Sequence, residues 1–206
     1  MSKLCVVVPT YNEAESLPEL IKQVEDVLSD VSFKLIVVDD GSPDGTAKVA
    51  EQLNAVYGNI LVQSRSVKSG LGSAIQVGFR AALGMGDVES ILTLDADLSH
   101  DPREIPRLLD AGRTADLVQG SRYVKNGRAI GWVSRGDYRK CAEIIVGSAV
   151  RNGFEWVVEV LFIVKRSRLI VEEVPIAFVD RRDGRTKLKN RDILRWGFYA
   201  GRSLFT

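Results

Sequence analysis

Apolar residues in the first 120 positions fall into short runs that alternate with stretches of helical spacing. The run at 4–8 is rich in β-branched residues, which is typical of a buried strand. Between 16 and 28 the apolar residues recur every three or four positions, which predicts an amphipathic helix. Ser16 is the expected N-cap of this helix, Pro18 suits its first turn, and Glu19 completes the sequence of a capping box.

The same alternation continues along the chain. It predicts strands at 34–38, 60–63, 90–94 and 117–119, and helices at 45–57, 70–83 and 102–111, the last of them capped by Asp101. Strands that alternate with helices form βαβ units, which build a mostly parallel sheet covered by helices on both faces. The sequence therefore predicts an α/β fold whose ligands bind beyond the carboxyl ends of the strands.

The pattern after residue 121 is less regular. It predicts helices at 137–149 and 154–165, a strand at 169–174 that ends at Pro175, and an extended continuation at 176–179. Residues 190–205 combine an amphipathic pattern with aromatic and basic side chains, which suits a helix at a membrane interface. We therefore expect one domain over 1–189 and a C-terminal interfacial helix over 190–206.

Composition limits the classes that this pattern can represent. The chain has 206 residues, 45% of them hydrophobic, which suffices for the core of one domain and excludes a disordered chain. Two cysteines exclude a disulfide scaffold and suggest reduced thiols in the cytoplasm. The longest apolar candidate for a membrane span, 156–164, is too short and contains Glu159, and the N-terminus lacks the features of a signal peptide.

The net charge of +1 conceals an asymmetry between two parts of the chain. Residues 1–121 hold 10 Lys/Arg and 18 Asp/Glu, whereas residues 122–206 hold 18 Lys/Arg and 9 Asp/Glu. Such a split indicates that the second part meets an anion, and phosphates, nucleic acid and an anionic membrane surface all qualify. A basic surface that is merely solvated is the alternative.

Pairs of acidic residues follow two of the predicted strands. Asp95 and Asp97 stand where two carboxylates can reach one hard divalent cation, Mg²⁺ or Mn²⁺, that is shared with substrate phosphates. Of the other pair, Asp39 suits the turn that follows, and Asp40 suits a hydrogen bond from a nucleobase or ribose. The alternative for both pairs is turn chemistry alone, since Asp is a common turn residue.

Three further features stay ambiguous in the sequence. Residues 68–73 resemble a phosphate-binding loop only superficially, so a strand-to-helix turn beside the ligand is the better interpretation. His100, the single histidine, follows the acidic pair as a candidate ligand or base, but a loop histidine before a capped helix is the simpler interpretation. Basic residues recur around Arg122, around Arg135 and at 181–187, and such residues suit phosphate binding or plain solvation.

Taken together, these motifs resemble those of a known family. The segments 8–13 (VPTYNE), 37–42 (VVDDGS) and 95–97 (DAD) resemble family 2 glycosyltransferases of the GT-A fold. The segments 120–123 (GSRY), 134–136 (SRG), 174–176 (VPI) and 181–188 (RRDGRTKL) resemble a narrower group, the dolichol-phosphate mannose synthases and related polyprenyl-phosphate hexosyl synthases. The resemblance covers nearly the whole chain.

The resemblance implies a role for each matching residue. The nucleotide sugar would be held by Pro9, Tyr11, Glu13, Val38, Asp40, Asp95, Ala96, Asp97, Arg122, Arg181 and Lys187. The metal, Mg²⁺ or Mn²⁺, would be held by Asp95, Asp97 and Ser99, and family members often have glutamine at this third position. Catalysis would depend on Asp97, Arg122 and Arg135, with both arginines in a phosphate-binding cluster beside Arg181 and Lys187.

The chain also departs from the family in two places. Gly136 is followed directly by residues 137–140, whereas the family usually has a helical, membrane-facing segment and an acceptor loop there. Many relatives continue into transmembrane helices, and this sequence stops at Thr206, so we expect a short-type or truncated member.

The implied reaction is transfer of mannose from GDP-mannose to dolichyl or polyprenyl phosphate, with inversion, at the cytoplasmic face of a membrane. Peripheral membrane contact is expected, and no nucleic acid partner. A phosphate monoester has a second pKa of about 6, so it can attack without a catalytic base. One alternative is a family 2 enzyme with a hydroxyl acceptor and a base such as Asp137 or Asp180; another is a catalytically silent subunit that binds a nucleotide sugar.

Overall fold

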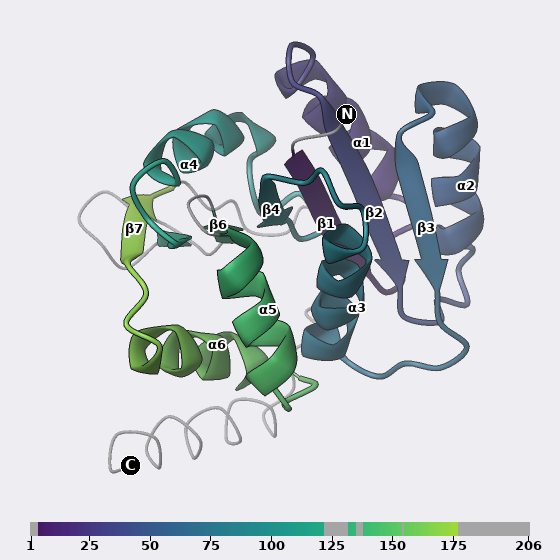
Figure 1. Ribbon diagram of the computed structural model, residues 1–206. Coiled ribbons are helices and arrows are strands. Elements are labelled where there is room, and N and C mark those ends of the chain that lie inside the picture. Colours follow the sequence, from purple (N-terminus) through teal and green to yellow (C-terminus); the bar gives the residue numbers. More distant parts are fainter. Residues whose placement is uncertain (1–3, 122–131, 135–137, 154, 177–206) are drawn as a thin grey trace.

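The computed structural model describes residues 4–121, 132–134, 138–153 and 155–176 (Figure 1). Their strands are β1 (Leu4–Thr10), β2 (Phe33–Asp39), β3 (Ile60–Ser64), β4 (Ser90–Thr93), β5 (Leu117–Ser121), β6 (Trp132–Ser134) and β7 (Val171–Pro175). Their α-helices are α1 (Leu17–Val27), α2 (Thr46–Tyr57), α3 (Leu71–Leu83), α4 (Ile105–Ala111), α5 (Tyr138–Ser148) and α6 (Glu155–Arg166). The predicted boundary between 1–189 and 190–206 lies outside the described residues.

The seven strands form one mostly parallel sheet in the order β3-β2-β1-β4-β6-β5-β7. Strand β1 pairs in parallel with β2 and β4, β2 with β3, and β5 with β7. Only β6, among the described strands, runs antiparallel to its neighbours β4 and β5. The predicted α/β fold is confirmed, although the sequence pattern does not predict β6, because three residues carry too little periodicity.

Helices cover both faces of the sheet, which explains why the central strands are apolar without interruption. Val6 and Val8 of β1 face a core shared with α1, α2 and α4, whereas Cys5 and Val7 face a second core shared with α3, α5 and α6. Figure 1 shows α1 and α2 behind the strands and α3 in front of them. Because successive residues of a strand point to opposite faces, β1 anchors both cores at once.

The capping box predicted at the start of α1 is wrong. Ser16 has helical backbone angles (φ −83°, ψ −29°), and its side chain makes no capping bond to the described residues. Its Oγ donates instead to Oε2 of Glu13 over 3.0 Å, while Glu19 accepts from Gln23 one turn later. The helix begins without this cap because the Ser16 hydroxyl is engaged by Glu13 and its backbone is helical rather than extended, the conformation that an N-cap needs.

The helix predicted at 102–111 starts as a 3₁₀ turn, Pro102–Glu104, before α4 begins. Asp101 caps this turn as predicted, since its Oδ1 accepts the backbone N–H of Arg103 over 3.0 Å. The other predicted elements agree with the structure to within one or two residues, where they lie in the described part of the chain. None of the helices over these residues is long and apolar enough to cross a membrane.

Candidate functional site

The carboxyl ends of β2, β1 and β4 meet at one edge of the sheet, because these strands are parallel neighbours. Three loops leave this edge: residues 11–16 after β1, 40–45 after β2, and 94–101 after β4. They carry the motifs that the sequence analysis assigned to ligand binding. Ligands of open α/β sheets bind in this position, so this edge is the candidate site.

The loops after β1 and β2 are joined by a row of hydrogen bonds. Three successive backbone N–H groups of the first loop donate to side chains of the second loop or of the first residue of α2: Asn12 to Ser42 Oγ (2.9 Å), Glu13 to Thr46 Oγ1 (3.0 Å) and Ala14 to Asp44 Oδ2 (3.1 Å). Asn12 has a left-handed backbone (φ 55°), which asparagine tolerates better than most residues. The two loops therefore form one preorganised unit.

Asp39 serves the turn after β2, as its position in the sequence indicates. It is 2% exposed and accepts the backbone N–H of Ser42 over 3.0 Å and the hydroxyl of Thr10 over 3.2 Å. Gly41 completes the turn with φ +72°, where a side chain would be strained and its Cβ would lie 3.2 Å from the carbonyl oxygen of Arg65. This carboxylate thus holds the loop in shape.

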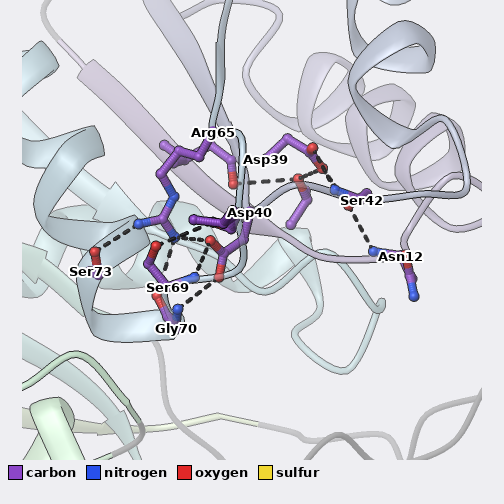
Figure 2. A network of polar contacts seen from close by, with 11 residues as sticks. Asn12, Asp39, Asp40, Ser42, Arg65, Ser69, Gly70 and Ser73 are labelled. Atoms are coloured by element: carbon purple, nitrogen blue, oxygen red, sulfur yellow. Dashed lines mark hydrogen bonds and ion pairs between the residues drawn. The ribbon is translucent and has the colours of Figure 1, made fainter.

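Asp40 lies at the centre of the polar network in Figure 2. It is 4% exposed, accepts the backbone N–H groups of Ser69 (2.7 Å) and Gly70 (2.8 Å), and pairs with Arg65 over 2.6 Å. Arg65 donates in turn to the hydroxyl of Ser73 over 2.7 Å. Asp40 therefore anchors the loop between β3 and α3 at the site edge.

These contacts bear on the predicted role of Asp40 toward a nucleoside. A carboxylate has about four lone-pair sites, and three of those on Asp40 are engaged within the protein. The nucleoside contact stays a prediction, and a structural role stands beside it. Sequence reasoning missed Arg65, although a charged residue directly after β3, at the same edge, was a usable signal.

The anchored loop brings a cation to the edge. The ammonium of Lys68 lies 3.5 Å from the centroid of the Tyr11 ring, which is cation–π geometry. Residues 68–70 belong to the connection between β3 and α3, which confirms the predicted strand-to-helix turn. Lys68 and Tyr11 bring the loops after β3 and β1 together.

The loop after β4 presents the predicted metal ligands. The side chain of Asp95 is 47% exposed, and Oδ1 of Asp97 accepts the backbone N–H of Ser99 over 3.1 Å. Ala96 is buried in the core below, and Leu98 packs against that core with a left-handed backbone, φ 60°. This conformation costs about 1 to 2 kcal/mol for leucine, and the core contact offsets it.

A divalent cation fits the two aspartates only with further ligands. Within the described residues, no group of three or more His, Cys, Asp and Glu side chains is arranged to hold a metal ion. Mg²⁺ commonly binds through one or two carboxylates together with substrate phosphates and water, and the exposed Asp95 allows this. Ser99 is 2% exposed and contacts Asp97 through its backbone, so its hydroxyl as a ligand stays a prediction without support here.

The remaining predicted residues divide into two groups. Pro9, Val38 and Ala96 are buried in the fold, so any contact of theirs with a nucleotide would have to use the backbone. The basic cluster of Arg122, Arg135, Arg181 and Lys187, and the alternative bases Asp137 and Asp180, lie outside the described residues. Their predicted roles stay predictions.

The fold and this edge define an α/β protein with a candidate ligand site at the loops after β1, β2 and β4, the last of which carries two aspartates. The chain belongs to glycosyl transferase family 2, whose family model matches residues 5–168. It is therefore a glycosyltransferase, as the motifs after β1, β2 and β4 predicted.

Three curated proteins are similar to this chain in sequence. An undecaprenyl-phosphate mannosyltransferase of Micrococcus luteus is 32% identical in an alignment that covers 96% of this chain and 95% of that protein. A dolichol-phosphate mannosyltransferase of Pyrococcus furiosus is 33% identical over 94% of this chain and 61% of its own length. A polyprenol monophosphomannose synthase of Mycolicibacterium smegmatis is 44% identical over 62% of this chain and 48% of its own length.

Solved structures share the fold at low identity. Glucosyl-3-phosphoglycerate synthase of Mycobacterium tuberculosis, in complex with Mn²⁺, UDP and phosphoglyceric acid, matches with a TM-score of 0.66 at 17% identity, covering 98% of this chain and 77% of that chain. TarS of S. aureus, in complex with UDP-GlcNAc, matches with a TM-score of 0.66 at 15% identity, covering 99% and 67%. The predicted GT-A fold class is confirmed.

Proposed function

We propose that this glycosyltransferase moves mannose from GDP-mannose to the phosphate of dolichyl or another polyprenyl phosphate, with inversion. The observation that carries the proposal is the likeness to the undecaprenyl-phosphate mannosyltransferase, which extends over nearly the full length of both chains. The names of the other two relatives refer to the same class of acceptor.

The joined loops after β1 and β2 bind the nucleotide-sugar donor. Tyr11, Glu13 and Asp40 hold the guanosine part of the donor, on a frame that the hydrogen bonds between the loops keep in place. Asp95 and Asp97 hold a divalent cation together with the donor diphosphate. When bound, this cation neutralises charge on the leaving group.

The acceptor phosphate explains why a catalytic base is not needed. Its second pKa is about 6, so at neutral pH it is largely ionised and attacks the anomeric carbon directly. The single histidine already accepts the backbone N–H of Asp95 through Nδ1, which supports a mechanism that does not use it as a base. Arg122, Arg135, Arg181 and Lys187 bind the phosphates, in the part of the chain with the strongly positive charge balance.

A lipid acceptor places the enzyme at a membrane. We propose peripheral contact at the cytoplasmic face through residues 190–206, where basic and aromatic residues occur together. Co-sedimentation with anionic and with neutral vesicles tests this. Binding to anionic vesicles alone is the expected result, and binding to neither would contradict it.

A transfer assay tests which nucleotide sugar is the donor and whether a divalent cation is needed. The assay offers GDP-mannose and UDP-glucose in turn, with a short prenyl phosphate and either Mg²⁺, Mn²⁺ or a chelator. We expect GDP-mannose to be used, the chelator to abolish transfer, and Asp97→Asn to lower kcat by about a hundredfold or more. Asp110→Asn, at a 77% exposed side chain on α4, is the matched control and should leave kcat unchanged.

Two results would contradict this account. A preference for UDP-glucose would overturn the donor assignment while leaving the acceptor assignment intact. Wild-type turnover by Asp97→Asn would place the metal elsewhere.

A further inference from the structure

His100 lies near the end of the loop that carries the predicted metal ligands, and the proposed mechanism assigns no role to its side chain. It is 7% exposed, and its Nδ1 accepts the backbone N–H of Asp95 over 3.3 Å. The same nitrogen lies 3.8 Å from Oδ2 of Asp95. His100 thus folds back onto the first residue of the loop, five positions earlier.

This hydrogen bond limits what the imidazole can do. A neutral imidazole has one nitrogen that accepts and one that carries a proton. The bond from the Asp95 N–H assigns the acceptor role to Nδ1, so the proton is assigned to Nε2. With Nδ1 engaged and Nε2 protonated, neither nitrogen offers a lone pair to a metal ion or to a substrate proton.

Other contacts hold the same loop at separate points. Leu98 packs against the core from a left-handed backbone, and the N–H of Ser99 binds Oδ1 of Asp97. These contacts fix the middle of the loop. The His100–Asp95 bond joins the two ends of the segment 95–100, which begins two residues after β4 ends.

We infer that His100 is a positioning residue: its Nδ1 closes the loop from Asp95 to His100 and thereby sets the direction of the Asp95 and Asp97 carboxylates toward the cation. This inference rests on the proposed donor site for its functional consequence, whereas the closure itself is a property of the protein alone. Groups that orient metal ligands in this way typically change metal affinity 10- to 100-fold when they are removed.

Three variants of the full chain distinguish the hydrogen-bond acceptor at the δ position of residue 100 from the rest of the imidazole ring. His100→Asn places an amide oxygen where Nδ1 stands, His100→Gln places its polar atoms near Nε2, and His100→Ala removes both. The first readout is hydrogen exchange of the Asp95 amide in protein without metal or nucleotide. The second is Mn²⁺ affinity in the presence of GDP, by titration of free Mn²⁺, with the melting temperature as a check on folding.

We expect His100→Asn to keep the Asp95 amide protected and to bind Mn²⁺ within about threefold of the wild type. His100→Gln and His100→Ala should exchange this amide roughly tenfold faster and bind Mn²⁺ at least about tenfold more weakly. The inference is overturned if His100→Asn is as impaired as His100→Ala, or if His100→Ala lowers the melting temperature without changing Mn²⁺ affinity. If the wild type binds no Mn²⁺ with GDP, the donor proposal and the functional part of the inference fail together, and the exchange pattern still decides the closure.

Discussion

Asp44 connects two of the site loops through a carboxylate at the molecular surface. It accepts the backbone N–H of Ala14 over 3.1 Å and that of Thr46 over 3.0 Å, and the Thr46 hydroxyl donates to it as well. Partial desolvation acts to raise the pKa of this carboxyl, but the hydrogen bonds from Thr46 and Ala14 outweigh it and lower the pKa below 3.8. The folded protein therefore favours the ionised form of Asp44.

This lowered pKa predicts a pH-dependent stability. A carboxyl with a lower pKa in the folded than in the unfolded state stabilises the fold above the unfolded pKa, and the contribution disappears as the pH falls through the folded pKa. Asp44→Asn should therefore lower the melting temperature at pH 7, and the difference from wild type should narrow toward pH 3. Asp30→Asn, at an exposed loop position, is the control for scanning calorimetry. A deficit that is equal at both pH values would contradict this role.

The ion pair of Arg65 and Asp40 leads to a second prediction about single residues. The side chain of Arg65 is 15% exposed and that of Asp40 5%, so removing one partner leaves a largely buried charge, which costs about 3 to 5 kcal/mol. Arg65→Met should lower the free energy of unfolding in urea by at least about 3 kcal/mol. Lys22→Met breaks an exposed pair with Asp26 and should change it by less than about 1 kcal/mol.

Asp40→Asn then separates the two roles of that carboxylate. A loss of stability with unchanged GDP affinity in calorimetry would assign Asp40 to the loop alone. Weaker GDP binding at full stability would assign it to the nucleoside alone. We expect both quantities to fall, because the carboxylate anchors a loop that carries Lys68 to the site edge.

The roles of some site residues can be predicted from the sequence, and those of others cannot. Asp39 is predictable as a turn residue because its partner Ser42 is three positions away. Asp95 and Asp97 are predictable because their spacing at a strand end has a chemical meaning. The partnership of Arg65 with Asp40 is not, since it joins the residues that directly follow two different strands and depends on the register of β2 against β3.

At the scale of elements, α3 contacts the central strand closely through a glycine. A Cβ on Gly78 would lie 2.3 Å from Cγ1 of Val7 in β1, which is too close for any real contact. Val7 is fully buried between α3 and the sheet, so it has little room to yield. Gly78 therefore sets the distance between α3 and the sheet.

Gly78→Ala should lower the free energy of unfolding by about 1 to 3 kcal/mol, the usual cost of overpacking a core. Gly147→Ala is the matched control in α5, because no described atom lies within 4 Å of the new Cβ. It should raise stability by up to about 1 kcal/mol, since alanine is the better helix former. Denaturant unfolding of both variants checks this, and a neutral Gly78→Ala would show that α3 can move away.

Helices and strands of the first 120 residues could be predicted because each buries a regular apolar pattern. The exact ends of these elements were less predictable. The capping box at Ser16 fails because Glu13, in the preceding loop, takes its hydroxyl. Strand β6 could not be predicted, because its pairing with β4 and β5 is decided by distant neighbours rather than by its own three residues.

At the scale of the whole molecule, strand order brings separate motifs into one site. The motif after β1 ends at residue 13 and the motif after β4 begins at residue 95, and the parallel order β2-β1-β4 places both at one edge with the motif after β2. This edge could be predicted from the βαβ pattern. The residues around the acceptor phosphate could not be predicted from this pattern. The basic residues assigned to it rest on the family resemblance and lie outside the described residues.

The central claim is that a phosphate, rather than a hydroxyl, receives the sugar. The most direct measurement is the initial rate of mannose transfer from GDP-mannose to a short prenyl phosphate and to the prenol of the same chain length, with Mn²⁺ present. We predict rapid transfer to the phosphate and transfer at least about a thousandfold slower to the alcohol, which needs a base to remove its proton. Transfer to the alcohol at a rate equal to or higher than transfer to the phosphate would contradict the account.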